Sequence, residues 1–207
     1  MMQPPSHPSI IRATQEEVNA LVREVLPAQG HWSEDSYLWL TEHTTQLIEF
    51  TDGYLEVLAM PTDKHQTLVL FLYEVLAAFV RPRGGKVLVA PLRLRIRAGK
   101  YREPDLLLLC SAQDSRRQER FWLGADCVME VVSPDKPERD MVEKRQDYAE
   151  ARIAEYWLVD PQHDTITVLR FDDGTYVEHG VFPRGAVATS VVLAGFTVSV
   201  DALFDAR

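Results

Sequence analysis

Two apolar runs, each carrying one acid, constrain the fold of this chain more than any other feature. The first reads DLLLLC at residues 105–110, and the second reads CVMEVV at residues 127–132. Short, nearly continuous apolar runs of this kind are typical of strands that are buried on both faces of a sheet. We therefore predict buried strands at residues 105–110 and 126–132, with Asp105 beginning one and Glu130 inside the other.

These two acids are the first candidates for chemistry. A carboxylate in a buried strand costs free energy unless it is ion-paired, hydrogen-bonded or bound to a metal. Taken singly, either acid could equally well pair with an arginine or accept from a backbone amide. Taken together, on strands close in sequence, Asp105 and Glu130 indicate a divalent-cation site, and their oxygen ligands favour Mg²⁺ or Mn²⁺ over zinc.

The remaining pattern predicts an α/β (α+β) chain with a mixed β-sheet core flanked by helices and additional C-terminal hairpin strands. Hydrophobic periodicity and turn signals place the elements. The predicted helices are 34–41, 64–80 and 140–151, and the predicted strands are 46–50, 54–59, 86–91, 92–97, 155–160, 165–171 and 176–178, with a final strand and capping turn in the tail. Residues 111–123 are polar and predict a loop.

The N-terminal residues form a separate segment in this interpretation. Residues 1–12 are rich in proline and predict a loose arm, and the sequence T-x-x-E at Thr14 is a capping box that begins a helix. We predict an arm and helix at residues 1–31 and a single domain at residues 32–207, since 207 residues with 46% hydrophobic content suit one core.

The composition also limits location and partners. No apolar run approaches the roughly 18 residues that a membrane helix needs, and the start shows no secretory signal, so we expect a cytoplasmic protein without a membrane contact. Cys110 and Cys127 adjoin apolar runs and are expected to be buried free thiols. The net charge of −9 argues against a protein held on nucleic acid by bulk electrostatics.

A local basic cluster remains compatible with nucleic acid. Arg93, Arg95 and Arg97 alternate with apolar residues, so they share one strand face, and Lys100 and Arg102 follow. This face could contact phosphates, or it could simply be solvated.

Three segments resemble the Uma-type restriction endonuclease family, a branch of the restriction-endonuclease-like PD-(D/E)XK superfamily. They are EPDLLLL, VMEVVSPDKPERDMVEKRQDYAEARIAEYWLVDP and LIEFTDGYLEVLAMPTDKHQ. The resemblance covers residues 32–207, and the length and order of the second segment make it specific.

The resemblance implies a site. Asp105 and Glu130 would be metal ligands, and the backbone carbonyl of Val131 would complete the set. The superfamily's usual lysine lies two residues after the Glu, where this chain has Val132. Lys144, on the following helix, is the expected replacement, and the alternative is an ordinary surface pair with Asp140 four residues earlier.

Two further residues fit the same pattern. Glu49 matches an acid of the family and could hold a second metal or act as a base. His65 opens a helix facing the sheet, where the N-terminal dipole disfavours imidazolium. A neutral His65 could ligate a metal or position water, or be a satisfied buried histidine. Tyr148, Tyr156 and Trp157 match the family but are interpreted as core residues.

The sequence therefore predicts a Mg²⁺- or Mn²⁺-dependent endonuclease that hydrolyses phosphodiester bonds in DNA. One alternative is an inactive nucleic-acid-binding or regulatory module of the same fold, favoured by Val132 and the acidic balance. Another is a protein that acts on RNA. A homodimer is plausible because cleavage of both strands of a duplex needs two active sites.

Overall fold

The computed structural model describes residues 14, 16, 26–133 and 137–207. The predicted arm at residues 1–12 lies outside the described residues. So does most of the helix predicted to begin at the capping box, of which only residues 14 and 16 are described. Within the described part, no helix is long and apolar enough to cross a membrane.

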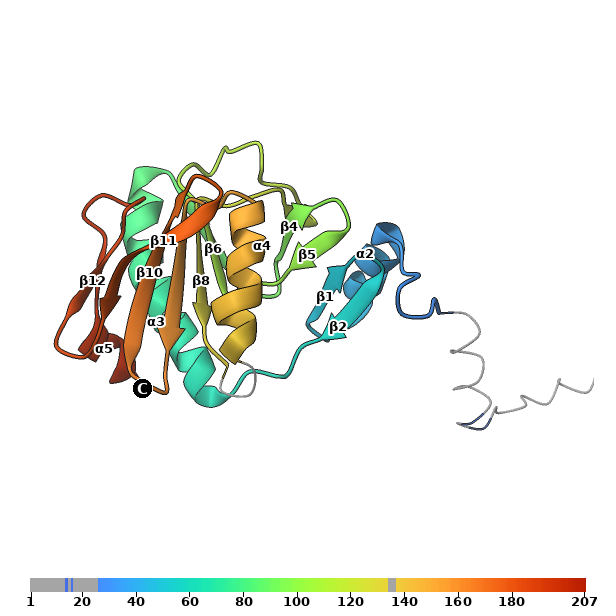
Figure 1. The fold of residues 1–207 in the computed structure, drawn as a ribbon, viewed down its shortest axis with the longest axis horizontal. Helices are drawn as coiled ribbons and strands as arrows, with labels where there is room; N and C mark the ends of the chain where they lie inside the picture. Colours follow the sequence, from blue (N-terminus) through green and yellow to red (C-terminus); the bar gives the residue numbers. More distant parts are fainter. Residues whose placement is uncertain (1–13, 15, 17–25, 134–136) are drawn as a thin grey trace, which may run out of the picture.

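The core is a six-stranded mixed sheet with the strand order β11-β10-β9-β8-β6-β3 (Figure 1). β8 and β9 are parallel, and the other neighbours in this sheet are antiparallel. The strands are β3 (Lys86–Val89), β6 (Leu106–Leu109), β8 (Cys127–Val131), β9 (Glu155–Asp160), β10 (Thr165–Asp172) and β11 (Thr175–Phe182). The two acid-bearing runs of the sequence thus form adjacent central strands, β6 and β8.

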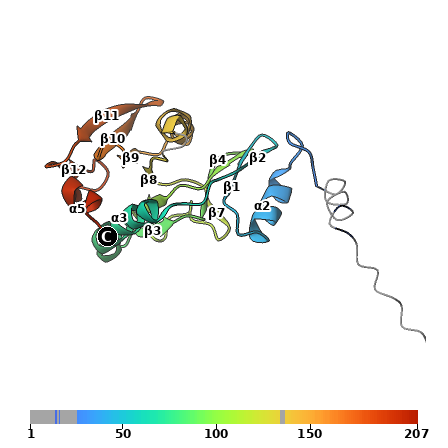
Figure 2. The same cartoon turned by 90° about the horizontal axis from the view of Figure 1, so that it is seen from below.

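Helices cover both faces of this sheet (Figures 1 and 2). Helix α3 (Asp63–Val80) begins where the Thr62 hydroxyl caps the His65 amide, and its buried stripe includes Leu68, Leu72 and Leu76. On the other face, the π-helical turn η2 (Arg139–Glu143) leads into α4 (Lys144–Glu150), which buries Tyr148. Successive strand residues point to opposite faces, so Met129 and Val131 pack with α3 while Val128 and Val132 pack with Tyr148.

A second sheet has the order β2-β1-β5-β4-β7 and adjoins the face that α4 covers. Its strands are β1 (Ile48–Thr51), β2 (Tyr54–Val57), β4 (Arg93–Arg97), β5 (Lys100–Arg102) and β7 (Phe121–Trp122), and helix α2 (Glu34–Glu42) packs on it through Tyr37 and Leu38. The predicted hairpin around Gly53 is confirmed; Gly53 has φ +89°, and a Cβ there would lie 2.5 Å from the Gly30 carbonyl oxygen.

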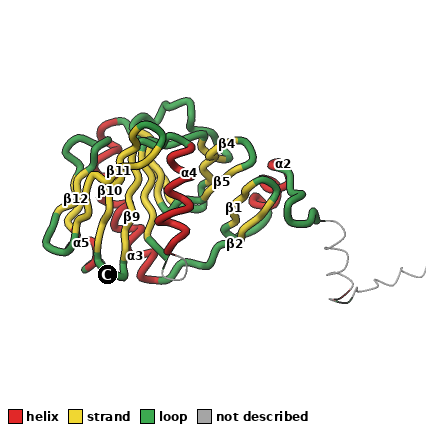
Figure 3. Tube along the Cα trace, in the orientation of Figure 1, coloured by secondary structure: helices red, strands yellow, loops and turns green. Residues whose placement is uncertain are grey.

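The C-terminal residues form strands and a short helix beside α3 (Figure 3). These C-terminal elements are β12 (Val187–Thr189), β13 (Thr197–Ser199) and α5 (Val200–Phe204). The short 3-10 helix η1 (Arg81–Arg83) directly follows α3. The predicted mixed sheet flanked by helices with extra C-terminal strands is confirmed. Strands β5 and β7 were not predicted, because they have three and two residues respectively and carry no periodic pattern.

Candidate functional site

Asp105 and Glu130 lie side by side on neighbouring strands. β6 and β8 are antiparallel with Leu106 opposite Met129, which brings Asp105 next to Glu130. The backbone N–H of Asp105 donates to Glu130 Oε2 at 3.3 Å, and the backbone N–H of Val131 donates to Asp105 Oδ2 at 2.8 Å. The prediction that the two acids lie on neighbouring strands is therefore confirmed.

Lys144 reaches the same pair from the helix. Its side chain is only 7% exposed, and its Nζ lies 2.8 Å from Glu130 Oε1 and 3.0 Å from Asp140 Oδ1. The alternative of a surface pair with Asp140 is therefore wrong, because the lysine joins a helix acid to a strand acid inside the protein. Burial lowers the pKa of Lys144, but Glu130 and Asp140 raise it, and the net shift is upward, so the side chain is an ammonium.

Val132, which stands where the superfamily has its lysine, is 4% exposed and belongs to the apolar cluster that contains Leu107 and Tyr148. It lies on the same strand face as Glu130, as alternation requires. The ammonium group that this position lacks is supplied to Glu130 by Lys144 from α4.

Tyr148 contributes more than the core packing that the sequence indicated. Its ring packs edge-on against Tyr156 at 5.0 Å, and its hydroxyl donates a hydrogen bond to Glu130 Oε1. Burial raises the pKa of Tyr148 well above its usual value, so the hydroxyl keeps its proton and remains a donor. Glu130 Oε1 thus has two donors, Tyr148 and Lys144, which fix the carboxylate. The Lys144–Tyr148 spacing of four residues was the signal in the sequence.

Glu130 is disfavoured as a carboxylate even with the Lys144 ammonium beside it. Burial raises the pKa of Glu130 to about 8, with Lys144 opposing the shift and Asp105 and Asp140 adding to it. Two buried acids that repel one another explain the direction. A cation bound at this pair would lower the pKa of Glu130 and offset the repulsion.

His65 contacts Asp105 directly. Its Nε2 lies 3.1 Å from Asp105 Oδ2, and its Nδ1 is buried without a hydrogen-bond partner. The pKa of His65 is raised in the absence of a cation, opposite to the direction expected from the helix dipole alone. Burial lowers this pKa, but the hydrogen bond to Asp105 and the charges of Asp105 and Glu130 outweigh burial.

Glu49 is held by cations rather than by the Asp105–Glu130 pair. It is 1% exposed, pairs with Arg139 and with Arg102 at 3.4 Å, and accepts from the Glu103 backbone N–H at 3.1 Å. Burial raises the pKa of Glu49, but the charges of Lys144, Arg102 and Arg139 lower it by more, so the net shift is downward. Glu49 is therefore an ionised, fully engaged carboxylate.

Glu103 is a buried acid that the sequence analysis missed. It is 5% exposed, and its Oε2 has no hydrogen-bond partner. Burial raises its pKa to about 8, and the charge of Glu49 adds to that effect. The sequence carried a signal for it, because Glu103 lies two residues before Asp105 in the E-P-D sequence.

The basic strand face is mostly engaged within the protein. Arg97 pairs with Asp52 at 2.7 Å and with Glu150 at 2.9 Å, and Arg95 lies 3.6 Å from Glu34. Arg93 has two buried guanidinium nitrogens, Nε and Nη1, without partners. The arginines do share one face, as predicted, but this face is half-buried, and Arg95 and Arg97 are ion-paired within the protein.

A cavity of about 740 Å³ opens onto the two acids. Its wall includes Asp105, Glu130, Val131, Lys144 and His65, together with an apolar rim from the chain between β2 and α3. A cavity of this size is typical of sites that enclose small molecules or parts of larger ones. The residues predicted from the sequence for a metal site, apart from Glu49, therefore line a single cavity.

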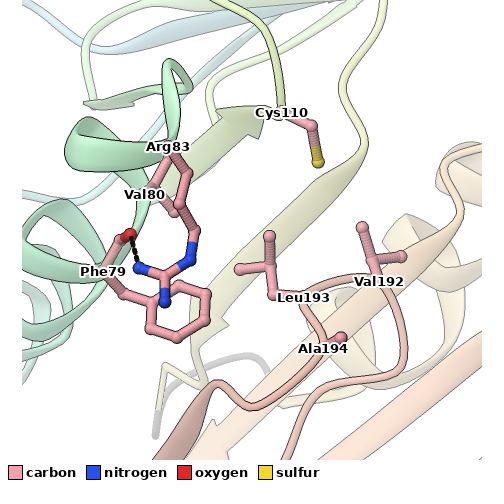
Figure 4. Close-up of a pocket in the computed structure, with 7 residues that line it drawn as sticks. All are labelled: Phe79, Val80, Arg83, Cys110, Val192, Leu193 and Ala194. Carbon is pink, nitrogen blue, oxygen red and sulfur yellow. Dashed lines mark hydrogen bonds between the residues drawn. The ribbon is translucent and has the colours of Figure 1, made fainter.

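A second cavity of about 300 Å³ lies between the end of α3 and the loop at residues 192–194 (Figure 4). Arg83 stacks on Phe79 at 3.8 Å there, and Cys110 faces the loop. Cys110 is exposed, contrary to expectation, whereas Cys127 is buried as expected. Partial desolvation of the thiol, together with the charge of Asp126, raises the pKa of Cys110 to about 11, so it is not a thiolate at neutral pH.

The carboxyl pair fits a hard divalent cation. Among the described residues, no three His, Cys, Asp or Glu side chains converge as a ready-made metal centre. Mg²⁺, however, usually keeps several waters and is held through only one or two carboxylates. Asp105 and Glu130 supply that number of oxygen ligands, and both line the open cavity, so a hydrated cation could reach them. The donor set therefore fits Mg²⁺ or Mn²⁺.

The mixed sheet, with its acids on adjacent strands and helices on both faces, defines a restriction-endonuclease-like fold. The model of the Uma2 family, described as "Putative restriction endonuclease", matches residues 34–201, and the chain therefore belongs to this family. Among solved structures, a putative nuclease of DUF820 from Anabaena variabilis ATCC 29413 is similar, with a TM-score of 0.68 and 21% identity over 86% of this chain and 98% of that one. No curated protein matches.

Proposed function

We propose that this chain is a Mg²⁺- or Mn²⁺-dependent endonuclease that hydrolyses phosphodiester bonds in DNA. The observation that carries the proposal is the Asp105–Glu130 pair, with the Lys144 ammonium 2.8 Å from Glu130 and an open cavity in front of it. Membership of the Uma2 family and the similarity to a protein described as a nuclease support it.

Each residue has a distinct role in this proposal. Asp105 and Glu130, with the carbonyl of Val131, would hold the cation, and His65 would either join them or orient Asp105 through its hydrogen bond. The cation, when bound, lowers the pKa of a water molecule and offsets charge on the phosphate. Lys144 stabilises the charge that develops as the phosphodiester bond breaks.

Glu49 acts indirectly in this proposal, through the residues that it holds in place. Because both of its oxygens are engaged, by Arg139, Arg102 and the Glu103 amide, we assign it to positioning rather than to proton transfer. It holds Arg139 at the wall of the cavity beside Asp140 and Lys144. We further propose a cytoplasmic location and a homodimer for cleavage of both strands.

Cleavage of supercoiled DNA with millimolar Mn²⁺ or Mg²⁺ tests the proposal. The wild type should nick and linearise the DNA, and chelation of the metal should stop it. Glu130→Gln should abolish cleavage, whereas Glu178→Gln, an exposed substitution of the same kind on β11, should not. A folded wild type that cleaves neither DNA nor RNA with either metal would favour the inactive binding module instead.

A further inference from the structure

The cavity continues beyond the acids as an apolar wall. Its outer lining comes from the end of β2, from the chain that leads to α3 and from the first turns of α3. Val57, Met60 and Leu70 belong to this lining and remain 61%, 70% and 53% exposed. Exposed apolar side chains that gather at the mouth of a polar site are typical of a binding surface.

The charges of the same cavity do not suit a double helix. The described lining residues include two permanent cations, Arg139 and Lys144, a histidine that pairs with Asp105, His65, and five acids, Glu56, Glu103, Asp105, Glu130 and Asp140. Both cations are engaged inside the protein, because Arg139 pairs with Glu49 and Glu56 and Lys144 pairs with Glu130 and Asp140.

Duplex DNA carries one negative charge for about every 1.7 Å of helix axis and is bound mainly through lysine and arginine contacts to these phosphates. The described lining offers no uncommitted cation for a row of phosphates. An unpaired nucleotide makes a different demand, since it brings one phosphate to the acids and their cation and presents a flat apolar base nearby. Bases that leave the stack are commonly bound against aromatic or apolar side chains.

We propose that this site takes an unpaired DNA strand, with one phosphate at the Asp105–Glu130 pair and the adjacent base against Val57, Met60 and Leu70. This inference rests on the proposed nuclease function and narrows its substrate from DNA in general to single-stranded or locally unpaired DNA. The acidic lining near the phosphate then requires the cation for binding as well as for cleavage.

Equilibrium binding tests the inference separately from catalysis. Fluorescence anisotropy would compare a short labelled DNA strand, its blunt duplex and an RNA strand of the same sequence, with millimolar Ca²⁺ as the divalent cation. The DNA strand should bind at least about tenfold more tightly than the duplex, a difference of about 1.4 kcal/mol. Met60→Glu, which adds charge to the apolar wall at an exposed position, should weaken binding of the strand by about tenfold.

Val187→Glu is the matched control, since Val187 is an exposed aliphatic residue on β12 and does not line the cavity. The inference is overturned if the duplex binds as tightly as the strand, if neither binds, if RNA binds better than DNA, or if the two variants behave alike. DNA cleavage without preferential strand binding would refute the substrate class alone. Strand binding without cleavage of any substrate would refute the proposed catalysis alone.

Discussion

Replacing Lys144 with methionine separates catalysis from packing at this site. Methionine keeps much of the volume of the lysine stem but removes the ammonium that bridges Glu130 Oε1 at 2.8 Å and Asp140 Oδ1 at 3.0 Å. If the ammonium stabilises charge that develops during hydrolysis, its loss should reduce kcat by about 10²- to 10³-fold, the cost of about 3–4 kcal/mol for one electrostatic stabiliser.

The stability cost of this change is limited by the titration of Glu130. Removing one partner of a buried ion pair usually costs about 3–5 kcal/mol, because the other charge stays buried and unpaired. The pKa of Glu130 is already about 8, and it rises further without the lysine, because Lys144 lowers it. At neutral pH the carboxyl group can therefore take up a proton, and the Lys144→Met protein should remain folded with a lower Tm.

Lys100→Met is the control for this experiment. Lys100 is also largely buried, at 13% exposed, and lies between two acids, with its Nζ 2.7 Å from Asp147 and 3.0 Å from Glu150, but it does not line the cavity. Steady-state cleavage of DNA with Mn²⁺ should show a large loss of kcat for Lys144→Met and near-normal kcat for Lys100→Met. Equal losses, or full activity in both, would refute the role of Lys144 in the chemistry.

Three further outcomes are expected. Asp105→Asn should abolish the rise in Tm with millimolar Mg²⁺ and lower the pKa of His65, which NMR titration would measure; an unchanged His65 pKa would contradict the pairing. Because protons compete with the cation at Glu130, the metal-induced rise in Tm should grow as the pH approaches about 8 and then level off, and a gain that is constant across this range would oppose a shared buried site. Glu155→Ala should lower the free energy of unfolding by about 3–5 kcal/mol in chemical denaturation, since it strands the donors of Trp157 and of the loop at residues 190–192, while the exposed Glu178→Ala should change it by less than about 0.5 kcal/mol.

The fold could be predicted from the sequence wherever burial imposes a period. The runs that contain Asp105 and Glu130 had to be buried strands, and the stripe of α3 had to face a sheet, because no other placement removes so many branched side chains from water. The short strands β5 and β7 could not be predicted this way. They are set by pairing with other strands, β5 with β1 and β4 and β7 with β4, rather than by their own side chains.

The site was partly predictable for the same reason. An acid inside an apolar run is visible in one dimension, which is why Asp105 and Glu130 were found. The state of His65 was not predictable, because its pKa depends on carboxylates that approach from other elements. The hydrogen bond of Tyr148 to Glu130 could not be predicted from the helical pattern. That pattern predicts only that the ring is buried, and the ring packs against Tyr156 while the hydroxyl contacts Glu130.

The position of Lys144 shows why a spacing motif is an incomplete description of such a site. What the chemistry requires is an ammonium near one carboxylate oxygen, and the strand position two residues after Glu130 is only one way to deliver it. Here Val132 fills that position with apolar packing against the residues that also hold Tyr148. The packing of Tyr148 against Tyr156 fixes α4 over the strand, and the helix then brings Lys144 and the Tyr148 hydroxyl to the same oxygen of Glu130. In the proposed mechanism Lys144 reaches Glu130 Oε1 from α4 rather than from the strand position that Val132 occupies, so the test of Lys144→Met distinguishes a displaced catalytic group from a lost one.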